Sequence, residues 1–388
     1  MTARTTATPA PRPAGAVGEP RVPVRRTSRR LADGREIIYF DDTAAAPPRD
    51  AVDLRPLGDR ASTGHIRFDA LVGDWVAVAG HRMNRTFLPP KDQCPLCPAG
   101  RAPGSEIPDA DYDVVVFENR FPSYGPVAEP VPSVPDPFRV APAVGRTEVV
   151  CFTSDHEASF GTLPASRVRT VIDVWADRTV ELGAREDVEH VFCFENRGQE
   201  IGVTLHHPHG QIYGYPYVPA RTREILGQAE AHLARTGRLL GADLLAAEVA
   251  DGSRVVLRGR HWSAYVPFAA RWPVEVHLAP HRDVPDLASL DDEERDELAS
   301  VYLDLLRRLD RFHVAADGSP IALPYIAAWH QAPARVGREA SRLFLQVMTV
   351  LRAPGKLKYL AGSESGVGGW VNDAAPEVVA ERIRSLAV

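Results

Sequence analysis

One order of predicted elements occurs twice along the chain, and it constrains the fold more than any other feature. The order is strand, helix, strand, strand, judged from short apolar runs and from apolar residues at helical spacing. The first copy covers 148–152, 164–183, 191–194 and 204–213, and the second covers 274–278, 291–312, 325–330 and 343–347. A repeated supersecondary pattern indicates two similar halves. We therefore predict an α+β fold built from two such halves.

The ends of these halves follow from composition. Residues 1–32 are rich in Pro and Arg and have no apolar stretch, which predicts a disordered tail rather than a secretory signal. The remaining chain divides into an N-terminal half, 33–230, and a C-terminal half, 231–388, joined near a helical stretch at 220–248. Further strands are expected at 36–40 and 75–78.

Charge and cysteine content exclude several classes of protein. The charged fraction is 25% and the net charge is −6, so nothing favours binding to nucleic acid. No apolar run approaches the roughly 20 residues that span a bilayer, so we expect no membrane contact. Four cysteines among 388 residues do not form a disulfide framework, and reduced thiols in the cytoplasm fit better.

The segment His207-Pro208-His209-Gly210-Gln211 carries the clearest chemistry. Side chains two apart on extended backbone share one face, so His207 and His209 can address one site. Gly210 allows a close approach of the backbone to a ligand. A neutral imidazole serves as a nucleophile, a base or a metal ligand near pH 7.

The wider segment, Thr204 to Tyr213, resembles the active-site signature of the galactose-1-phosphate uridylyltransferase family, a branch of the histidine-triad superfamily. The resemblance extends from about residue 65 to about 385. It implies two histidine-triad-like halves, each an antiparallel sheet with packed helices, forming one compact unit. The hydrolytic branch usually has a third histidine where this chain has Gln211. An amide donates hydrogen bonds but does not titrate, so a nucleotidylated His209 is expected to await a phosphate acceptor.

The resemblance implies that UMP is exchanged between UDP-glucose and galactose 1-phosphate in a ping-pong cycle. His209 is the expected nucleophile, and Gln211 assists it. The substrate-binding residues implied are Arg82, Arg85, Asn119, Arg120, Phe121, Asn196, Gly202, Thr204, Lys358, Tyr359 and Glu364. Two positions depart from the family pattern, because many members have aspartate at Arg120 and a glutamine near Trp370.

Cys94-Pro95-Leu96-Cys97 has the spacing of a metal-binding knuckle. The resemblance implies that His156 and His207 complete one structural Zn²⁺ site. Cys151 and Cys193 lie in apolar runs and are interpreted as buried thiols.

Some family members hold a second metal with a glutamate and three histidines. His330 matches one of these ligands, while Leu343, Leu345 and Ile225 fall at the others. We therefore predict no second metal site.

Two other functions remain open. One is a nucleotide-sugar phosphorylase or adenylyltransferase of the same superfamily, and the other is a non-catalytic, zinc-stabilised nucleotide-binding module. The intact pair His209 and Gln211 favours an enzyme. The resemblance also implies a homodimer with sites shared across the interface.

Overall fold

One large antiparallel sheet organises the protein. The computed structural model describes residues 23–58, 63–84, 87–102 and 104–387. Within these residues the sheet has the order β1-β2-β5-β7-β9-β8-β15-β16-β12-β11-β10. Its N-terminal strands are β1 (Arg25–Arg30), β2 (Glu36–Asp41), β5 (Val114–Glu118), β7 (Arg146–Cys151), β8 (His190–Arg197) and β9 (His209–Tyr215). Its C-terminal strands are β10 (Val255–Arg258), β11 (Trp262–Tyr265), β12 (Val274–Pro280), β15 (Tyr325–His330) and β16 (Phe344–Thr349).

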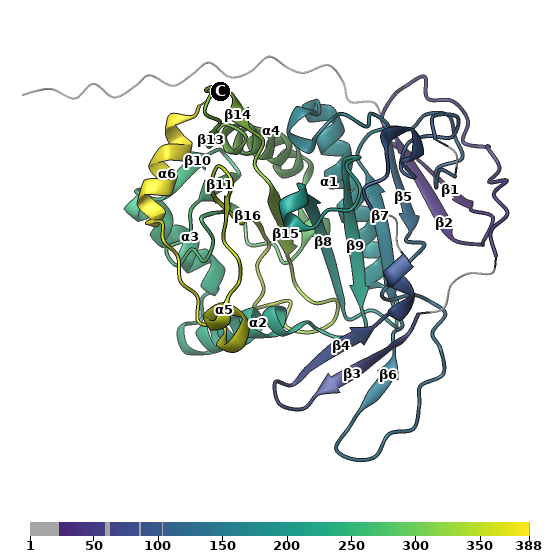
Figure 1. Ribbon diagram of the computed structural model, residues 1–388. Helices are drawn as coiled ribbons and strands as arrows, with labels where there is room; N and C mark the ends of the chain where they lie inside the picture. The colour runs from purple at the N-terminus through teal and green to yellow at the C-terminus, as the bar shows by residue number, and fades with distance from the viewer. Residues whose placement is uncertain (1–22, 59–62, 85–86, 103, 388) are drawn as a thin grey trace, which may run out of the picture.

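The predicted repeat is confirmed by the strand order. Outward from the central β8–β15 pair, the order is β8-β9-β7-β5-β2 on one side and β15-β16-β12-β11-β10 on the other. Helix α1 (Ala165–Gly183) connects β7 to β8, and α4 (Asp292–Leu309) connects β12 to β15 at the corresponding place (Figure 1). The two halves therefore join edge to edge into one continuous sheet, as an α+β fold.

The main core lies between this sheet and the helices α1 and α4. Both helices bury apolar faces against the same side of the sheet, with Trp175 of α1 and Tyr302 of α4 almost fully enclosed. The rings of Trp175 and Trp329 meet edge to face at 5.9 Å across the boundary between the halves. Apolar burial of this extent is the dominant favourable contribution to folding. It also holds the strands that carry the histidine segment rigidly in place.

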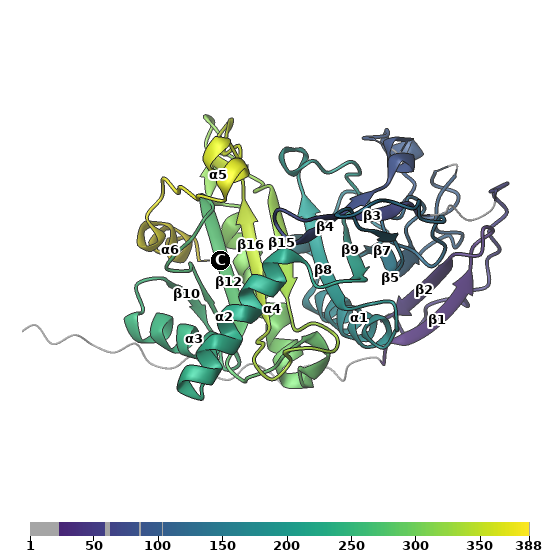
Figure 2. The same cartoon turned by 90° about the horizontal axis from the view of Figure 1, so that it is seen from below.

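The opposite side of the sheet carries smaller units. A loop containing the cysteine knuckle covers β2, β5 and β7, whereas Leu245 of α3 (Leu240–Asp251) packs on Tyr265 and Ala279. A small sheet of β4 (Asp74–Val78), β3 (His65–Asp69) and β6 (Val140–Pro142) projects from the body on this side (Figures 1 and 2). Figure 2 also places α5 (Gly362–Val367) on the side away from α1.

The remaining elements are connections and short pairs. The helices are α2 (Ala220–Thr236), α3 (Leu240–Asp251), α5 (Gly362–Val367) and α6 (Pro376–Ser385). The short strands are β13 (His313–Val314), β14 (Pro320–Ile321), β17 (Leu351–Ala353) and β18 (Lys356–Leu357). Single 3₁₀ turns occur at Gly80–Asn84, Lys91–Gln93, Phe160–Thr162, Gln199–Ile201 and Leu287–Ser289. Among the described residues no helix combines the length and the apolar character needed to cross a bilayer.

Two sequence expectations need correction or remain open. The disordered tail predicted for 1–32 is wrong for Arg25–Arg30, which form β1, while 1–22 lie outside the described residues. The strand pairs with β2, and Arg25 bonds Asp41 at 2.9 Å, so cross-strand ion pairs compensate for its lack of apolar residues. The boundary at residue 230 falls inside α2 and stays a prediction.

Candidate active site and metal centre

His209 is the first residue of β9, between β7 and β8. Its backbone lies opposite Cys151 of β7. Its Nδ1 lies 2.8 Å from the carbonyl oxygen of His207. A carbonyl oxygen only accepts hydrogen bonds, so Nδ1 carries the proton and Nε2 keeps its lone pair. Burial lowers the pKa of His209, which keeps the ring neutral at pH 7. The Nε2 lone pair is therefore free to act as a nucleophile, and the hydrogen bond to the backbone fixes the orientation of the ring.

Gln211 follows two residues later on the same face of β9 and lies opposite Phe194 of β8. Gly210, between them, faces the core, where an added Cβ would approach Phe152 Cζ to 2.8 Å and the Phe194 carbonyl oxygen to 2.9 Å. Only glycine fits this close approach of two strands. The Gly210 position therefore sets the spacing at which His209 and Gln211 are presented together.

A cavity of about 220 Å³ borders the histidine segment. Of the residues predicted from the sequence, Asn196, His207 and His209 line it, together with Glu195, Arg197, Gly198, Val203, Leu205, His206, Pro208, Ala158 and Ser159. The loop between β8 and β9 turns at Gly198 and Gly202, which have φ values of 96° and 83°. Left-handed backbone of this kind favours glycine. The carbonyl oxygen of Thr204 accepts a hydrogen bond from the Leu88 amide at 2.8 Å, which anchors the loop.

The segment 119–121 forms a compact turn. Asn119 Oδ1 accepts from the Phe121 amide at 2.8 Å, and Arg82 donates to the Phe121 carbonyl oxygen at 2.8 Å. The Arg120 guanidinium lies 3.7 Å from Glu106 and 5.8 Å from the centre of the Phe121 ring. The structure thus brings together Arg82, Asn119, Arg120 and Phe121. Arg85 lies outside the described residues.

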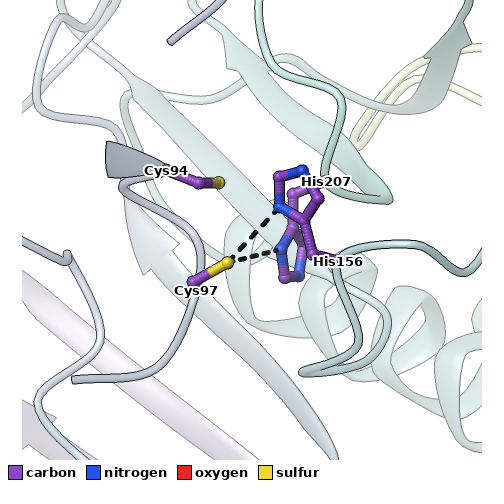
Figure 3. A group of neighbouring side chains, drawn as sticks. All are labelled: Cys94, Cys97, His156 and His207. Atoms are coloured by element: carbon purple, nitrogen blue, oxygen red, sulfur yellow. Dashed lines mark hydrogen bonds between the residues drawn. The ribbon is translucent and has the colours of Figure 1, made fainter. Parts of the chain in front are cut away.

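Cys94, Cys97, His156 and His207 converge as the sequence predicted. Their ligand atoms all lie within 4.8 Å of one another (Figure 3). Cys97 Sγ is 3.4 Å from Nδ1 of His156 and 3.6 Å from Nδ1 of His207. The knuckle, the segment after β7 and the segment before β9 contribute these side chains, so the cluster ties together three parts of the N-terminal half.

The chemistry of this donor set fits a metal ion. Burial and the neighbouring Cys94 raise the pKa of Cys97 to about 12, so two thiolates are unfavourable here without a cation. Burial lowers the pKa of His207 to about 4, which keeps the ring neutral as a ligand must be. Two thiolates and two imidazoles are a preferred tetrahedral set for Zn²⁺. The described residues can therefore hold a metal.

Sequence reasoning missed two groups that contact His207. Nε2 of His207 lies 2.8 Å from the hydroxyl of Tyr112 and 2.8 Å from the carbonyl oxygen of Thr153. Tyr112 also donates to the Leu96 carbonyl oxygen at 2.9 Å. No local pattern marks Tyr112, because its partner lies 95 positions further along the chain.

The predicted sugar segment lies elsewhere. Lys358 forms an ion pair with Glu364 at 3.5 Å, and its ammonium also donates to the Val371 carbonyl oxygen. The Lys358 ammonium lies 5.8 Å from the centre of the Trp370 ring. Glu364 lies in α5, which is separated from β9 by the C-terminal strands in both views (Figures 1 and 2). Tyr359 is 76% exposed. Within one chain these residues do not meet His209.

His330 has different neighbours from those matched in the sequence. Leu343 and Leu345 are buried in the core on the α4 side. His330 instead bonds Gln346 at 3.0 Å and stacks on Phe344 with ring centres 4.5 Å apart. The match of Leu343 and Leu345 to ligand positions is therefore wrong, because alternation along β16 places Phe344 and Gln346 beside His330. Among the described residues His330 belongs to no cluster of three ligand side chains. The absence of a second metal remains a prediction.

Comparison with known proteins gives one consistent family. Models of the N- and C-terminal domains of galactose-1-phosphate uridyl transferase match residues 56–219 and 225–387. Galactose-1-phosphate uridylyltransferase of Streptomyces lividans is 51% identical over 313 residues, which cover 80% of this chain and 81% of the relative. The enzyme of that name from Thermotoga maritima is 33% identical, covering 83% of this chain and 98% of the relative.

Solved structures agree with the sequence comparisons. A structure of a uridylyltransferase superimposes with a TM-score of 0.74 at 32% identity, covering 83% of this chain and 98% of that one. An ADP-glucose phosphorylase from Arabidopsis thaliana has a TM-score of 0.63 at 20% identity, which shows that it shares the fold.

Proposed function

Because this chain belongs to the galactose-1-phosphate uridylyltransferase family, we propose that it exchanges UMP between UDP-glucose and galactose 1-phosphate. The observation that carries this proposal is the hydrogen bond from His209 Nδ1 to the His207 carbonyl oxygen. It leaves Nε2 as a fixed lone pair beside an amide, Gln211, that does not titrate. A pre-oriented nucleophile without a neighbouring acid is suited to transfer between two phosphates.

The reaction proceeds in two displacements. Nε2 of His209 attacks the α-phosphorus of UDP-glucose, and the bond from that phosphorus to glucose 1-phosphate breaks. The electron pair of the broken bond leaves with glucose 1-phosphate, and UMP stays on the ring. A phosphate oxygen of galactose 1-phosphate then attacks the same phosphorus, and the imidazole leaves. The ring is cationic in the intermediate, and the His207 carbonyl oxygen stabilises its Nδ1–H throughout.

The surrounding residues bind and orient the nucleotide. Gln211 donates to a phosphoryl oxygen, and Arg82 and Arg85 supply positive charge. Asn196, near the end of β8, and Gly202 and Thr204, in the loop that follows it, lie beside the phosphates. Asn119 and Phe121 hold the nucleoside, with Arg120 next to them. Charge stabilisation by such fixed groups is commonly the largest contribution to phosphoryl transfer.

We propose one structural zinc per chain, held by Cys94, Cys97, His156 and His207. Four protein ligands leave no position for substrate, so the metal fixes the fold around the histidine segment and takes no part in bond making. Support comes from the convergence of the four ligand atoms. Zinc would hold the His207 ring, and thereby the His207 carbonyl oxygen that orients His209.

We further propose a homodimer in which the second copy supplies Lys358, Tyr359 and Glu364. The position of these residues away from His209 supports this assignment, because one chain alone leaves the acceptor sugar without its ligands. Tyr359 and Val367 are 76% and 85% exposed, as expected for a surface that reaches a partner. Lys358 would bind the sugar phosphate, and Glu364 would accept bonds from sugar hydroxyls.

We propose two further assignments. The division into 33–230 and 231–388 places the histidine segment in the first half. A cytoplasmic location agrees with four cysteines that form no disulfide in the structure.

The nucleotide preference leaves a second function open. Arg120 places a cation beside Phe121, where many family members have aspartate. A nucleotide-sugar phosphorylase with an adenylate intermediate is therefore the alternative to test.

The test is to incubate the protein in separate reactions with UDP-glucose radiolabelled in uridine and with ADP-glucose radiolabelled in adenosine, denature it and count label on the protein. Covalent label from UDP-glucose supports the uridylyltransferase. Label only from ADP-glucose supports the phosphorylase, and no label from either supports a non-catalytic module. The variant His209→Ala is the control for labelling elsewhere.

A further inference from the structure

Tyr112 is a buried residue that touches two of the segments forming the metal cluster. Its hydroxyl donates to the Leu96 carbonyl oxygen at 2.9 Å, inside the cysteine knuckle. The same hydroxyl lies 2.8 Å from Nε2 of His207. The Tyr112 side chain is 3% exposed and packs with Cys94, Leu96 and Cys97. It thus connects the knuckle to the histidine that faces it.

The direction of these hydrogen bonds follows from the partners. Nε2 of His207 also lies 2.8 Å from the Thr153 carbonyl oxygen, which has no proton to give. Nε2 must therefore carry the proton, shared between the Thr153 carbonyl and the Tyr112 hydroxyl oxygen. The Tyr112 proton remains free to donate to Leu96. Nδ1 of His207, which faces Cys97 Sγ at 3.6 Å, is left with its lone pair toward the metal position.

We propose that Tyr112 is a positioning residue of the metal centre, which holds the His207 ring and the cysteine knuckle at ligating distance. Hydrogen bonds to the far nitrogen of a ligating histidine fix its tautomer and orientation, and losing one costs roughly 10–100-fold in metal affinity. Tyr112 also donates to the Leu96 carbonyl oxygen, so it fixes the cysteine knuckle as well as the His207 ring. This inference rests on the proposed zinc site.

The position of Tyr112 also affects the nucleophile. The His207 ring faces Cys97, where the proposed metal would bind, and its carbonyl oxygen accepts from Nδ1 of His209 at 2.8 Å. A looser His207 would orient Nε2 of His209 less well without removing any group that binds substrate. The Tyr112 hydroxyl therefore influences kcat rather than KM.

The experiment uses the full-length zinc-loaded protein and the variant Tyr112→Phe, which keeps the ring and loses only the hydroxyl. Tyr124→Phe is the matched control, because Tyr124 is also buried and its hydroxyl bonds Tyr217 at 2.9 Å in a separate cluster. Zinc content is measured by elemental analysis, and zinc release is followed with a chromophoric chelator. Thermal unfolding is recorded for each protein with zinc and after zinc removal.

We expect zinc release from Tyr112→Phe to be at least about tenfold faster than from wild type and from Tyr124→Phe. Its Tm should fall below wild type only while zinc is bound, and kcat should fall with KM unchanged. Equal release rates in all three zinc-containing proteins would overturn the role of Tyr112 alone. A Tm difference that persists after zinc removal would show that the Tyr112 hydroxyl stabilises the fold itself rather than the metal centre. If elemental analysis finds no zinc in the wild-type protein, both the metal assignment and this inference are overturned.

Discussion

His207 and His209 are joined by a single hydrogen bond, from Nδ1 of His209 to the backbone carbonyl of His207 at 2.8 Å. The His207 ring points the other way, toward Cys97. In the proposed function one residue therefore serves the metal centre with its side chain and the nucleophile with its backbone. This arrangement would connect a metal with no open coordination position to catalysis.

Gln211→His tests why this chain has an amide at position 211, where the hydrolytic branch usually has a histidine. A titratable group beside the uridylylated His209 can activate water, so hydrolysis should rise relative to transfer. The ratio of free UMP to UDP-galactose, measured under single-turnover conditions, should increase. Gln211→Asn keeps an amide and is the control. An unchanged ratio in the histidine variant would remove our explanation of Gln211.

Cys94→Ser tests the metal centre. Loss of one thiolate should remove the zinc and lower Tm by roughly 5–10 °C, because three segments lose their common anchor. Activity should fall less than in His209 variants, since the metal takes no part in bond making. His330→Ala should leave the metal content unchanged. Elemental analysis that finds two metals per chain, or none in wild type, would contradict the assignment.

His190 predicts how stability depends on pH. Burial lowers its pKa to about 4, and its Nδ1 has no partner among the described residues. The unfolded chain, with a pKa near 6.5, binds the proton first, so stability is lost as pH falls from about 6.5 toward 4. Between pH 6.5 and 5 one such group lowers the free energy of unfolding by about 1.6 kcal/mol.

The variant His190→Phe removes this titration and suits the neighbouring rings of Phe192 and Tyr215. The fall in Tm between pH 7 and pH 5 should be smaller in the variant than in wild type. An equal fall in Tm in the two proteins would show that protonation of His190 does not contribute to the loss of stability at low pH.

Mixed dimers test the shared site. Lys358→Ala and His209→Ala should each be inactive alone. A random mixture should regain about a quarter of wild-type activity, since half the dimers are mixed and each has one intact site. Sizing by light scattering checks that dimers form. No recovery in mixed dimers would place Lys358 and His209 in the same chain's site.

Local spacing predicted part of this site, and the resemblance to a known family supplied the rest. Cys94 and Cys97 have the spacing of a metal-binding knuckle, whereas His156 and His207 were added by the resemblance. His207 precedes β9, so strand alternation alone does not fix its relation to His209. Helix α1 was predicted from apolar residues such as Val168 and Trp175, which the structure buries. The knuckle and the helix depend on neighbours along the chain, which the sequence displays directly.

Features that depend on distant partners were missed or misplaced. Strand β1 was not predicted, because its arginines are stabilised by acidic partners such as Asp41 on β2 and Glu181 on α1. Tyr112 has no signal of its own. Leu343 and Leu345 were matched to ligand positions, yet a shift of one residue along a strand reverses every side chain. Only the register of β16 against β15 shows that Phe344 and Gln346 lie beside His330.

The covalent intermediate tests the central claim most directly. Protein mixed with UDP-glucose alone, quenched and digested, should carry one uridylyl group on the peptide containing His209, as measured by mass spectrometry. Addition of galactose 1-phosphate before quenching should remove it. His209→Ala should keep its fold by circular dichroism, lack the adduct and lose at least about 10³-fold in kcat. An adduct on another residue, or wild-type exchange by His209→Ala, would contradict the account.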